Sequence, residues 1–241
     1  MHDFNRFVYL SLQKTGSTYI SHFLRHSSKL KLVKKKRHMF LTDDYDPSKF
    51  YFISIRDPLK IYSSLYRFGL QRKGGLYDNL FKAQLSHIYG KNNNEDFNQF
   101  LSFILDDKNK IYLREDFSQI PNSFNLGFVS FRFLKLIFPY PIRTLLAQEY
   151  LLNSKTNFNI KLLLNLSIVN SIIKIENVKS DLIRITNKFL PQYFDKKKVD
   201  SFLNESKPLN TSTKEAETFS LNESNREKFL SKERFLLSFY E

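Results

Sequence analysis

Apolar runs and amphipathic segments alternate along most of the chain, and their spacing predicts strands that alternate with helices. Residues 6–12 and 49–55 are rich in β-branched and aromatic side chains, which is typical of buried strands. Residues 18–25 carry apolar side chains on one helical face, and an Asp-Pro pair starts another helix that extends to about Phe68. We therefore expect a parallel sheet whose strands are joined by right-handed helical crossovers.

The rest of the chain continues this alternation without an internal repeat. Further helices are expected at residues 94–106, 128–137, 142–151 and 178–190, and further short strands at residues 29–33, 110–113 and 172–175. Gly74 and Gly75 mark a break, and Ser220 with Glu223 fits a capping box that starts the last helix. The chain has 241 residues, of which 41% are hydrophobic, and this suits one domain with its own core.

The charge of the chain favours anionic partners. Lys and Arg number 38 against 24 Asp and Glu, and the formal net charge of +14 suits nucleotides, acidic glycans, nucleic acids or anionic lipids without choosing among them. There is no cysteine, so disulfides and thiolate metal sites are excluded. No long apolar segment follows the first residues, and we expect no signal peptide, no transmembrane segment and a cytoplasmic location.

The turn after the first predicted strand has the composition of an anion-binding loop, with the sequence QKTGST at residues 13–18. A strand, a tight loop and a helix start direct backbone N–H groups and the positive helix end at one spot. Gly16 lets the backbone approach an anion, and Lys14 adds a mobile positive charge. Ser17 and Thr18 add hydroxyl donors. An ordinary turn with incidental polar residues would look similar, because short motifs often match by accident.

A second element follows the strand predicted at residues 49–55. Arg56 stands at the end of this strand, and Ser63 and Ser64 lie about two turns into the next helix. The arginine and one serine can converge on a phosphate. Alternatively, Arg56 pairs with a nearby acid and the serines belong to an ordinary helix surface.

Together the two elements resemble the PAPS-dependent sulfotransferase superfamily, whose donor is 3′-phosphoadenosine 5′-phosphosulfate (PAPS). QKTGST is similar to that family's 5′-phosphosulfate loop, and IRDPLKIYSSLYRF at residues 55–68 is similar to its 3′-phosphate motif. The family's spacing from Arg56 matches Ser64 better than Ser63. The glycan sulfotransferases, such as the heparan sulfate 2-O- and 6-O-sulfotransferases, are the most similar in these motifs.

The resemblance implies a single sulfotransferase-like domain over residues 1–241, with a three-layer, P-loop-like α/β fold and a central parallel sheet flanked by helices. Residues 175–178 resemble the late strand-to-helix junction of bacterial members, and residues 207–213 resemble a C-terminal loop over the nucleotide. Residues 69–170 match no family motif and are expected to hold acceptor specificity. The nucleotide-binding residues implied in this way are Lys14, Thr15, Gly16, Ser17, Thr18, Arg56, Ser64, Lys207, Thr211 and Ser212.

The implied reaction moves a sulfuryl group from PAPS to a hydroxyl acceptor. A glycan is the favoured acceptor, and a lipid or a small alcohol stays open. The transition state spreads negative charge over oxygens as in phosphoryl transfer, and Lys14 with fixed N–H groups can meet that charge without a metal. The sequence has no compact cluster of His, Asp and Glu with metal-ligand spacing, so we expect a metal-free mechanism.

The acceptor hydroxyl must lose a proton, and His38 is the candidate catalytic base. It lies between the first helix and the strand that leads to Arg56, the interval in which several glycan sulfotransferases place a catalytic histidine. The alternative is an exposed histidine that extends the basic run at residues 34–37.

Other titratable residues have simpler explanations. Glu115 and Asp116 are the next candidates for the base, although an ion pair with Arg114 or another cation explains them better. His22 and His26 are four residues apart on one predicted helix, but they lack a third metal ligand.

Three other functions fit parts of the sequence. A P-loop-type kinase would need a lysine after a second glycine, whereas Lys14 precedes the only glycine of the loop. A basic nucleic-acid-binding protein would suit the charge, but most of the 25 Phe and 13 Tyr occupy core-like periodic positions and no RNA-binding signature is visible. Residues 128–137 could rest on a lipid interface, although core packing is the better explanation.

Overall fold

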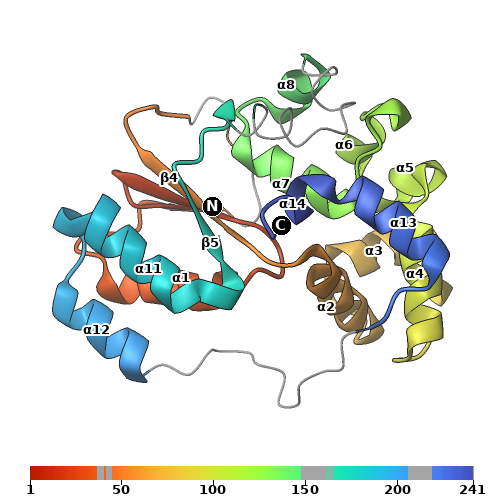
Figure 1. Ribbon diagram of the computed structural model, residues 1–241, viewed down its shortest axis with the longest axis horizontal. Coiled ribbons are helices and arrows are strands. Elements are labelled where there is room, and N and C mark those ends of the chain that lie inside the picture. The colour runs from red at the N-terminus through yellow and green to blue at the C-terminus, as the bar shows by residue number, and fades with distance from the viewer. Residues whose placement is uncertain (37–40, 42–44, 148–161, 163–164, 206–218, 241) are drawn as a thin grey trace. The chain divides into compact units, whose positions relative to one another are not determined.

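The computed structural model describes residues 1–36, 41, 45–147, 162, 165–205 and 219–240, and its central feature is a five-stranded sheet of order β3-β1-β2-β4-β5 (Figure 1). The strands are β1 (His2–Asp3), β2 (Phe7–Ser11), β3 (Lys34–Lys35), β4 (Phe50–Ile55) and β5 (Ser171–Lys174). Strands β2, β4 and β5 are parallel, whereas β1 runs antiparallel to both β2 and β3. The expected parallel sheet is therefore confirmed at its centre, but the sheet as a whole is mixed.

The chain divides into two compact units. Unit 1 comprises Met1–Arg56, Leu136–Pro139 and Ile168–Ala216, and it contains the sheet. Its helices are α1 (Ser17–Ser27), α11 (Val178–Arg184) and α12 (Lys196–Glu205). Unit 2 comprises Asp57–Lys135, Tyr140–Ser167 and Glu217–Glu241, and it is helical where it is described. The single domain predicted over residues 1–241 stays a prediction.

Short and medium-length helices make up unit 2. They are α2 (Pro58–Leu70), α3 (Gly75–Lys82), α4 (Asn94–Leu105), α5 (Lys110–Leu113), α6 (Glu115–Ser118), α7 (Phe128–Ile137, in this unit up to Lys135), α8 (Pro141–Ala147), α13 (Glu223–Lys232) and α14 (Arg234–Leu237). Among the described residues, no helix is long and apolar enough to cross a membrane.

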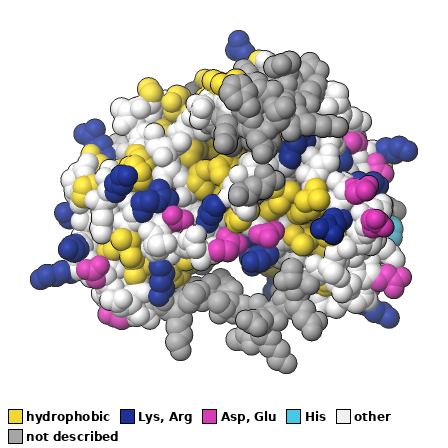
Figure 2. Space-filling view, in the orientation of Figure 1, with side chains coloured by type: hydrophobic (Ala, Val, Ile, Leu, Met, Phe, Trp, Pro, Cys, Tyr) yellow, Lys and Arg dark blue, Asp and Glu magenta, His cyan; other side chains and the backbone are white. Residues whose placement is uncertain are grey.

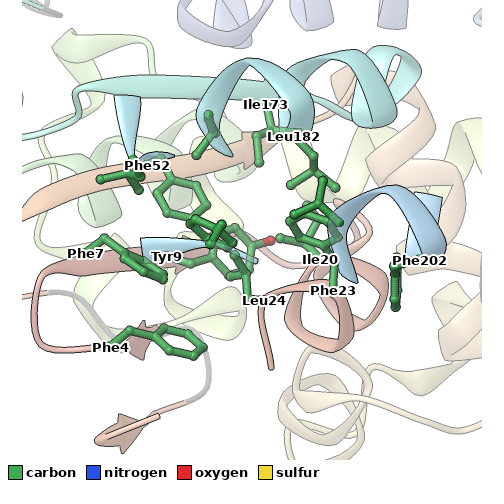
Figure 3. Packing of buried hydrophobic residues seen from close by; sticks show 14 of the residues in the cluster. Phe4, Phe7, Tyr9, Ile20, Phe23, Leu24, Phe52, Ile173, Leu182 and Phe202 are labelled. Atoms are coloured by element: carbon green, nitrogen blue, oxygen red, sulfur yellow. The ribbon is translucent and has the colours of Figure 1, made fainter. Parts of the chain in front are cut away.

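An aromatic core packs one face of the sheet against the helices of unit 1. Because side chains alternate along a strand, Phe7 and Tyr9 of β2 lie on the same face as Phe52 of β4. These rings pack with side chains of α1, α11 and α12, including Phe23 and Leu182 (Figure 3). The side chains of β2 and β4 that point to the opposite face of the sheet are also buried. Burial on both faces explains why these strands are continuous apolar runs, and it is compatible with a three-layer α/β fold.

Most predicted elements are confirmed within a residue or two. The strands at 6–12, 49–55 and 172–175 are β2, β4 and β5, and the helix at 18–25 is α1. The helix after Arg56 is α2, which starts at Pro58 and runs to Leu70. The predicted helices at 94–106 and 128–137 are α4 and α7, the one at 142–151 is α8 where it is described, and the one at 178–190 is α11 followed by a π-helical turn at Ile185–Phe189.

Three local predictions are wrong. Residues 29–33 form no strand, and the pairing falls on Lys34–Lys35, which joins β1. Residues 110–113 are helical because Lys110 and Leu113, three residues apart, are buried while the residues between them are exposed. The N-cap of α13 is Asn222, whose side chain accepts from the Asn225 N–H, so the capping box at Ser220 and Glu223 does not form.

Candidate functional site

The loop of residues 13–18 and Arg56 lie at the same edge of the sheet. Strands β2 and β4 are parallel neighbours in which Ser11 pairs with Ser54, so both strands end at this edge. In open α/β sheets, ligands bind outside the carboxyl ends of the strands. Arg56 follows β4 directly, and its Nη1 donates a long hydrogen bond of 3.5 Å to the carbonyl oxygen of Lys14. The loop and the strand end that carries Arg56 therefore meet within unit 1.

The backbone of this loop is held in an uncommon conformation. Lys14 has φ of 66° and Gly16 has φ of 67°, and both values lie in the left-handed region. For a residue with a side chain, such a conformation is strained by about 1–3 kcal/mol, and strain of this kind clusters at functional sites. Turns of this type are also where successive N–H groups form an anion-binding concavity.

Space is a second reason that favours glycine at position 16. A Cβ atom added at Gly16 would overlap the side chain of Ile175, which directly follows β5. The third parallel strand therefore also ends beside the loop. The strand-to-helix junction predicted at 175–178 is confirmed, because a 3-10 turn at Ile175–Asn177 leads into α11.

The N-terminus of α1 has no side-chain cap. Gly16 is the N-cap and supplies no side-chain hydrogen bond, and the first turn contains no acidic residue. Ser17 is half-buried and Thr18 is exposed there. By contrast, the N-terminus of α2 is satisfied by Asp57, whose Oδ1 accepts from the Leu59 N–H at 2.7 Å. Because the first N–H groups of a helix and its dipole attract negative charge, the start of α1 suits an anion, whereas α2 has closed its start with its own carboxylate.

Two cationic side chains add to this positive potential. Burial, followed by the charge of the Arg56 guanidinium, lowers the pKa of Lys14 to about 8. Among the described residues, no carboxylate forms an ion pair with Arg56, and its Nε is buried without a hydrogen-bond partner. Like charges placed together are unfavourable until a counter-charge arrives. The pair of cations therefore favours a bound anion.

Thr15 contributes to the loop differently from its neighbours. It was predicted to contact the nucleotide, but its side chain is fully buried and its Oγ1 donates to the Leu12 carbonyl oxygen at 2.8 Å. The same oxygen contacts Ser54 Oγ at 2.6 Å. The Thr15 hydroxyl is thus used inside the protein, and only its backbone N–H is left to face a ligand.

The choice between Ser63 and Ser64 can be made on burial within unit 2. Ser63 is 3% exposed, and its hydroxyl donates to the Leu59 carbonyl oxygen at 2.8 Å. Ser64 is half-buried and makes no side-chain hydrogen bond to any residue that the structure describes. These surroundings favour Ser64 over Ser63 as the serine that contacts a phosphate, as the family spacing does. Ser64 belongs to unit 2 and Arg56 to unit 1.

Several predicted site residues lie outside the described residues. They are His38, Lys207, Thr211 and Ser212. Of the alternative bases, Asp116 accepts from Arg114 Nε at 2.9 Å and also pairs with Lys135. The ion pair expected for Asp116 is therefore confirmed, and Asp116 lies on helix α6 without a preceding strand.

The two histidines of α1 have a structural explanation. His22 and His26 both contact the ring of Phe202 on α12, with centroids 5.3 and 5.6 Å apart. Within the described ranges, no group of three or more His, Asp or Glu side chains is placed to hold a metal ion. The spacing of His22 and His26 therefore reflects packing between two helices.

Most aromatic side chains are used in packing. Only Tyr45, Phe81, Tyr112 and Tyr140 are exposed among the aromatic residues that the structure describes. The helix at 128–137 is also almost entirely buried, which agrees with core packing and not with a lipid-facing surface. On the face shown in Figure 2, Lys and Arg side chains are spread out and Asp and Glu lie among them. Few exposed aromatic residues, and mixed charges on this face, are not typical of a nucleic-acid-binding surface.

No protein-family model, curated protein or solved structure matches this chain. The functional argument therefore depends on the residues themselves.

Two residues beneath the loop, Tyr9 and Ser54, were not predicted as part of the site. Ser54 is the only serine in the apolar run FYFISI, and Tyr9 carries a hydroxyl within the apolar run of β2. A hydroxyl inside a strand that is buried on both faces needs a partner, and this was the available signal.

Proposed function

We propose that this protein is a sulfotransferase that moves a sulfuryl group from PAPS to a hydroxyl acceptor. The observation that carries the proposal is the convergence of Lys14 and Arg56 beside the uncapped start of α1. Two cations and a set of N–H groups at one sheet edge suit a ligand with more than one anionic group. The similarity of residues 13–18 and 55–68 to the family's two phosphate motifs identifies PAPS as the best candidate.

In the proposed reaction, the acceptor oxygen forms a bond to sulfur while the bond between sulfur and the 5′-phosphate oxygen breaks. The products are a sulfate ester and 3′-phosphoadenosine 5′-phosphate, and the acceptor proton passes to a base. Lys14 and the N–H groups of the loop meet the charge that develops on the leaving phosphate and the transferring group. Arg56 is proposed to hold the 3′-phosphate, and for Ser64 this role is implied only by the resemblance to the family's motif. A glycan hydroxyl is the favoured acceptor, with a lipid or a small alcohol as alternatives.

Nucleotide selectivity gives the direct test of this function. We expect 3′-phosphoadenosine 5′-phosphate to bind about ten- to a hundredfold more tightly than AMP or ATP, because one charge-assisted contact to the 3′-phosphate contributes about 1.5–3 kcal/mol. A ligand that binds only the folded state raises the melting temperature, so thermal shifts at equal ligand concentrations give the ranking. Equal stabilisation by ATP, or a strict requirement for Mg²⁺, would instead support the kinase alternative.

His38 is proposed as the base that accepts the acceptor proton. An imidazole side chain can accept a proton at neutral pH, which suits this role. We expect His38→Asn to slow sulfuryl transfer while nucleotide affinity, measured by calorimetry, stays at the wild-type value. His87→Asn provides the matched control on an exposed histidine of unit 2. Normal turnover in His38→Asn would mean that His38 belongs to the basic run and is not the base. Glu115 would then be the next candidate base.

A further inference from the structure

Three buried hydroxyl groups form a continuous hydrogen-bonded chain beneath the loop of residues 13–18. Tyr9 Oη lies 2.6 Å from Ser54 Oγ, and Ser54 Oγ lies 2.6 Å from Thr15 Oγ1. Thr15 Oγ1 in turn donates to the Leu12 carbonyl oxygen at 2.8 Å. Tyr9, Ser54 and Thr15 are each 0% exposed, so bulk water cannot replace these contacts. All four residues belong to unit 1.

The direction of every hydrogen bond in this chain follows from one constraint, which is that each hydroxyl has a single hydrogen. Thr15 uses its hydrogen on the Leu12 carbonyl oxygen, so it must accept from Ser54. Ser54 has then used its own hydrogen and must accept from Tyr9. The chain therefore runs one way, from the core of the sheet to the loop.

The register of the sheet sets the start of this chain. Tyr9 pairs with Phe52, and Ser54 lies two residues further along β4 on the same face. Diagonal neighbours of this kind are within reach of a long aromatic side chain. The Tyr9 ring stacks on Phe52 with centroids 5.4 Å apart, and it lies within the aromatic core (Figure 3). The first hydroxyl is consequently held by rigid packing.

Stability alone does not explain why hydroxyl groups stand at these positions. Replacing both partners of a buried hydrogen bond by apolar groups of the same shape can be nearly neutral. Two other residues of β4 on the same face, Phe50 and Phe52, are apolar. The chain instead ends on Thr15, which lies between the two left-handed residues Lys14 and Gly16.

We propose that Tyr9 and Ser54 are positioning residues for the anion-binding loop, because their hydroxyl chain fixes Thr15 and thereby the conformations of Lys14 and Gly16. The identity of the ligand that binds the loop rests on the proposed function, whereas the conformation of the loop does not depend on it. The two can therefore be tested separately.

The test compares Ser54→Ala with Thr186→Val, a matched control in the same unit. Thr186 is 2% exposed, and its hydroxyl donates to the Leu182 carbonyl oxygen at 3.0 Å, away from the loop. The first measurement is the pKa of Lys14 in the ligand-free protein. It is obtained from a pH titration in which NMR monitors the Lys14 Cε atom. Wild type and the control should keep a Lys14 pKa of about 8, whereas in Ser54→Ala the pKa should rise toward 10.5 as the loop loosens and Lys14 reaches water.

The second measurement is the affinity for 3′-phosphoadenosine 5′-phosphate. Ser54→Ala should weaken it about tenfold, which corresponds to about 1.4 kcal/mol of lost preorganisation, while the control keeps wild-type affinity. Thr15→Ser keeps the hydroxyl and should behave like wild type, whereas Thr15→Val should behave like Ser54→Ala. Tyr9→Phe keeps the ring and the link from Ser54 to Thr15, so its effect should be smaller.

An unchanged Lys14 pKa in both Ser54→Ala and Thr15→Val would overturn the proposal. If Ser54→Ala does not fold, Tyr9→Phe serves in its place, and amide exchange at residues 13–18 must then be faster than in wild type for the proposal to hold. A protein that binds no nucleotide but shows the Lys14 shift would refute the proposed function and support the positioning role.

Discussion

Lys14→Met is expected to lower sulfuryl transfer by about 10²–10³-fold, while the affinity for 3′-phosphoadenosine 5′-phosphate falls much less. Removing one preorganised group that meets transition-state charge typically has an effect of this size on the rate. Methionine is unbranched and only one atom shorter than lysine, and it keeps the strain of the left-handed backbone, so the change removes mainly the charge. The rate is measured as release of 3′-phosphoadenosine 5′-phosphate from PAPS with a panel of glycan hydroxyl acceptors.

The control for this prediction is Lys29→Ala, which removes a positive charge from an exposed position just beyond the other end of α1. It should leave turnover at the wild-type value. A Lys14→Met protein that keeps both turnover and affinity would show that Lys14 is not part of the site. A variant that loses affinity and turnover equally would place Lys14 on a ground-state contact.

The pH dependence of nucleotide binding tests the same residue in another way. Because its pKa is lowered to about 8, Lys14 loses its positive charge in the free protein as the pH rises through that value. Binding an anion favours the charged form and takes up a proton, so affinity should fall above pH 8, in total by no more than the small loss that Lys14→Met shows. This fall should disappear in Lys14→Met, and calorimetry across the range measures it.

Local sequence patterns predicted the strands and helices that hold the site, because nearby residues determine where these elements form. Strands β2 and β4 are buried on both faces and therefore appear as apolar runs, and α2 begins at an Asp-Pro pair whose carboxylate caps it. The meeting of Arg56 with the loop followed from topology, since neighbouring parallel strands end at one edge.

The remaining features have nonlocal causes that a local pattern does not contain. Strands β1 and β3 have two polar residues each, and they exist because backbone pairing joins β1 to β2 and β3 to β1. The run at 110–113 is too short to separate a strand from a helix, and the inward position of Lys110 decides it. The contact between Ser54 and Thr15 joins residues 39 positions apart, so only the folded sheet reveals it.

Arg56→Ala is expected to weaken binding of 3′-phosphoadenosine 5′-phosphate by about ten- to a hundredfold. Arg56 is half-buried at the end of β4, and its Nε has no hydrogen-bond partner among the residues that the structure describes, so the side chain keeps an unused donor. A charge-assisted hydrogen bond to phosphate contributes about 1.5–3 kcal/mol, which corresponds to this loss. Titration calorimetry measures the affinity.

The informative comparison for Arg56 is with AMP, which lacks the 3′-phosphate. If Arg56 holds that phosphate, Arg56→Ala should change AMP affinity little, and the preference for the bisphosphate nucleotide should nearly vanish. Arg25→Ala is the matched control, because Arg25 is an exposed arginine of α1 that donates to its own helix at Ser21. Equal losses for both nucleotides would mean that Arg56 acts through the Lys14 carbonyl on loop geometry, and the 3′-phosphate assignment would then be wrong. Removal of the Arg56 charge should in either case raise the Lys14 pKa, because the neighbouring guanidinium is one of the two causes that lower it.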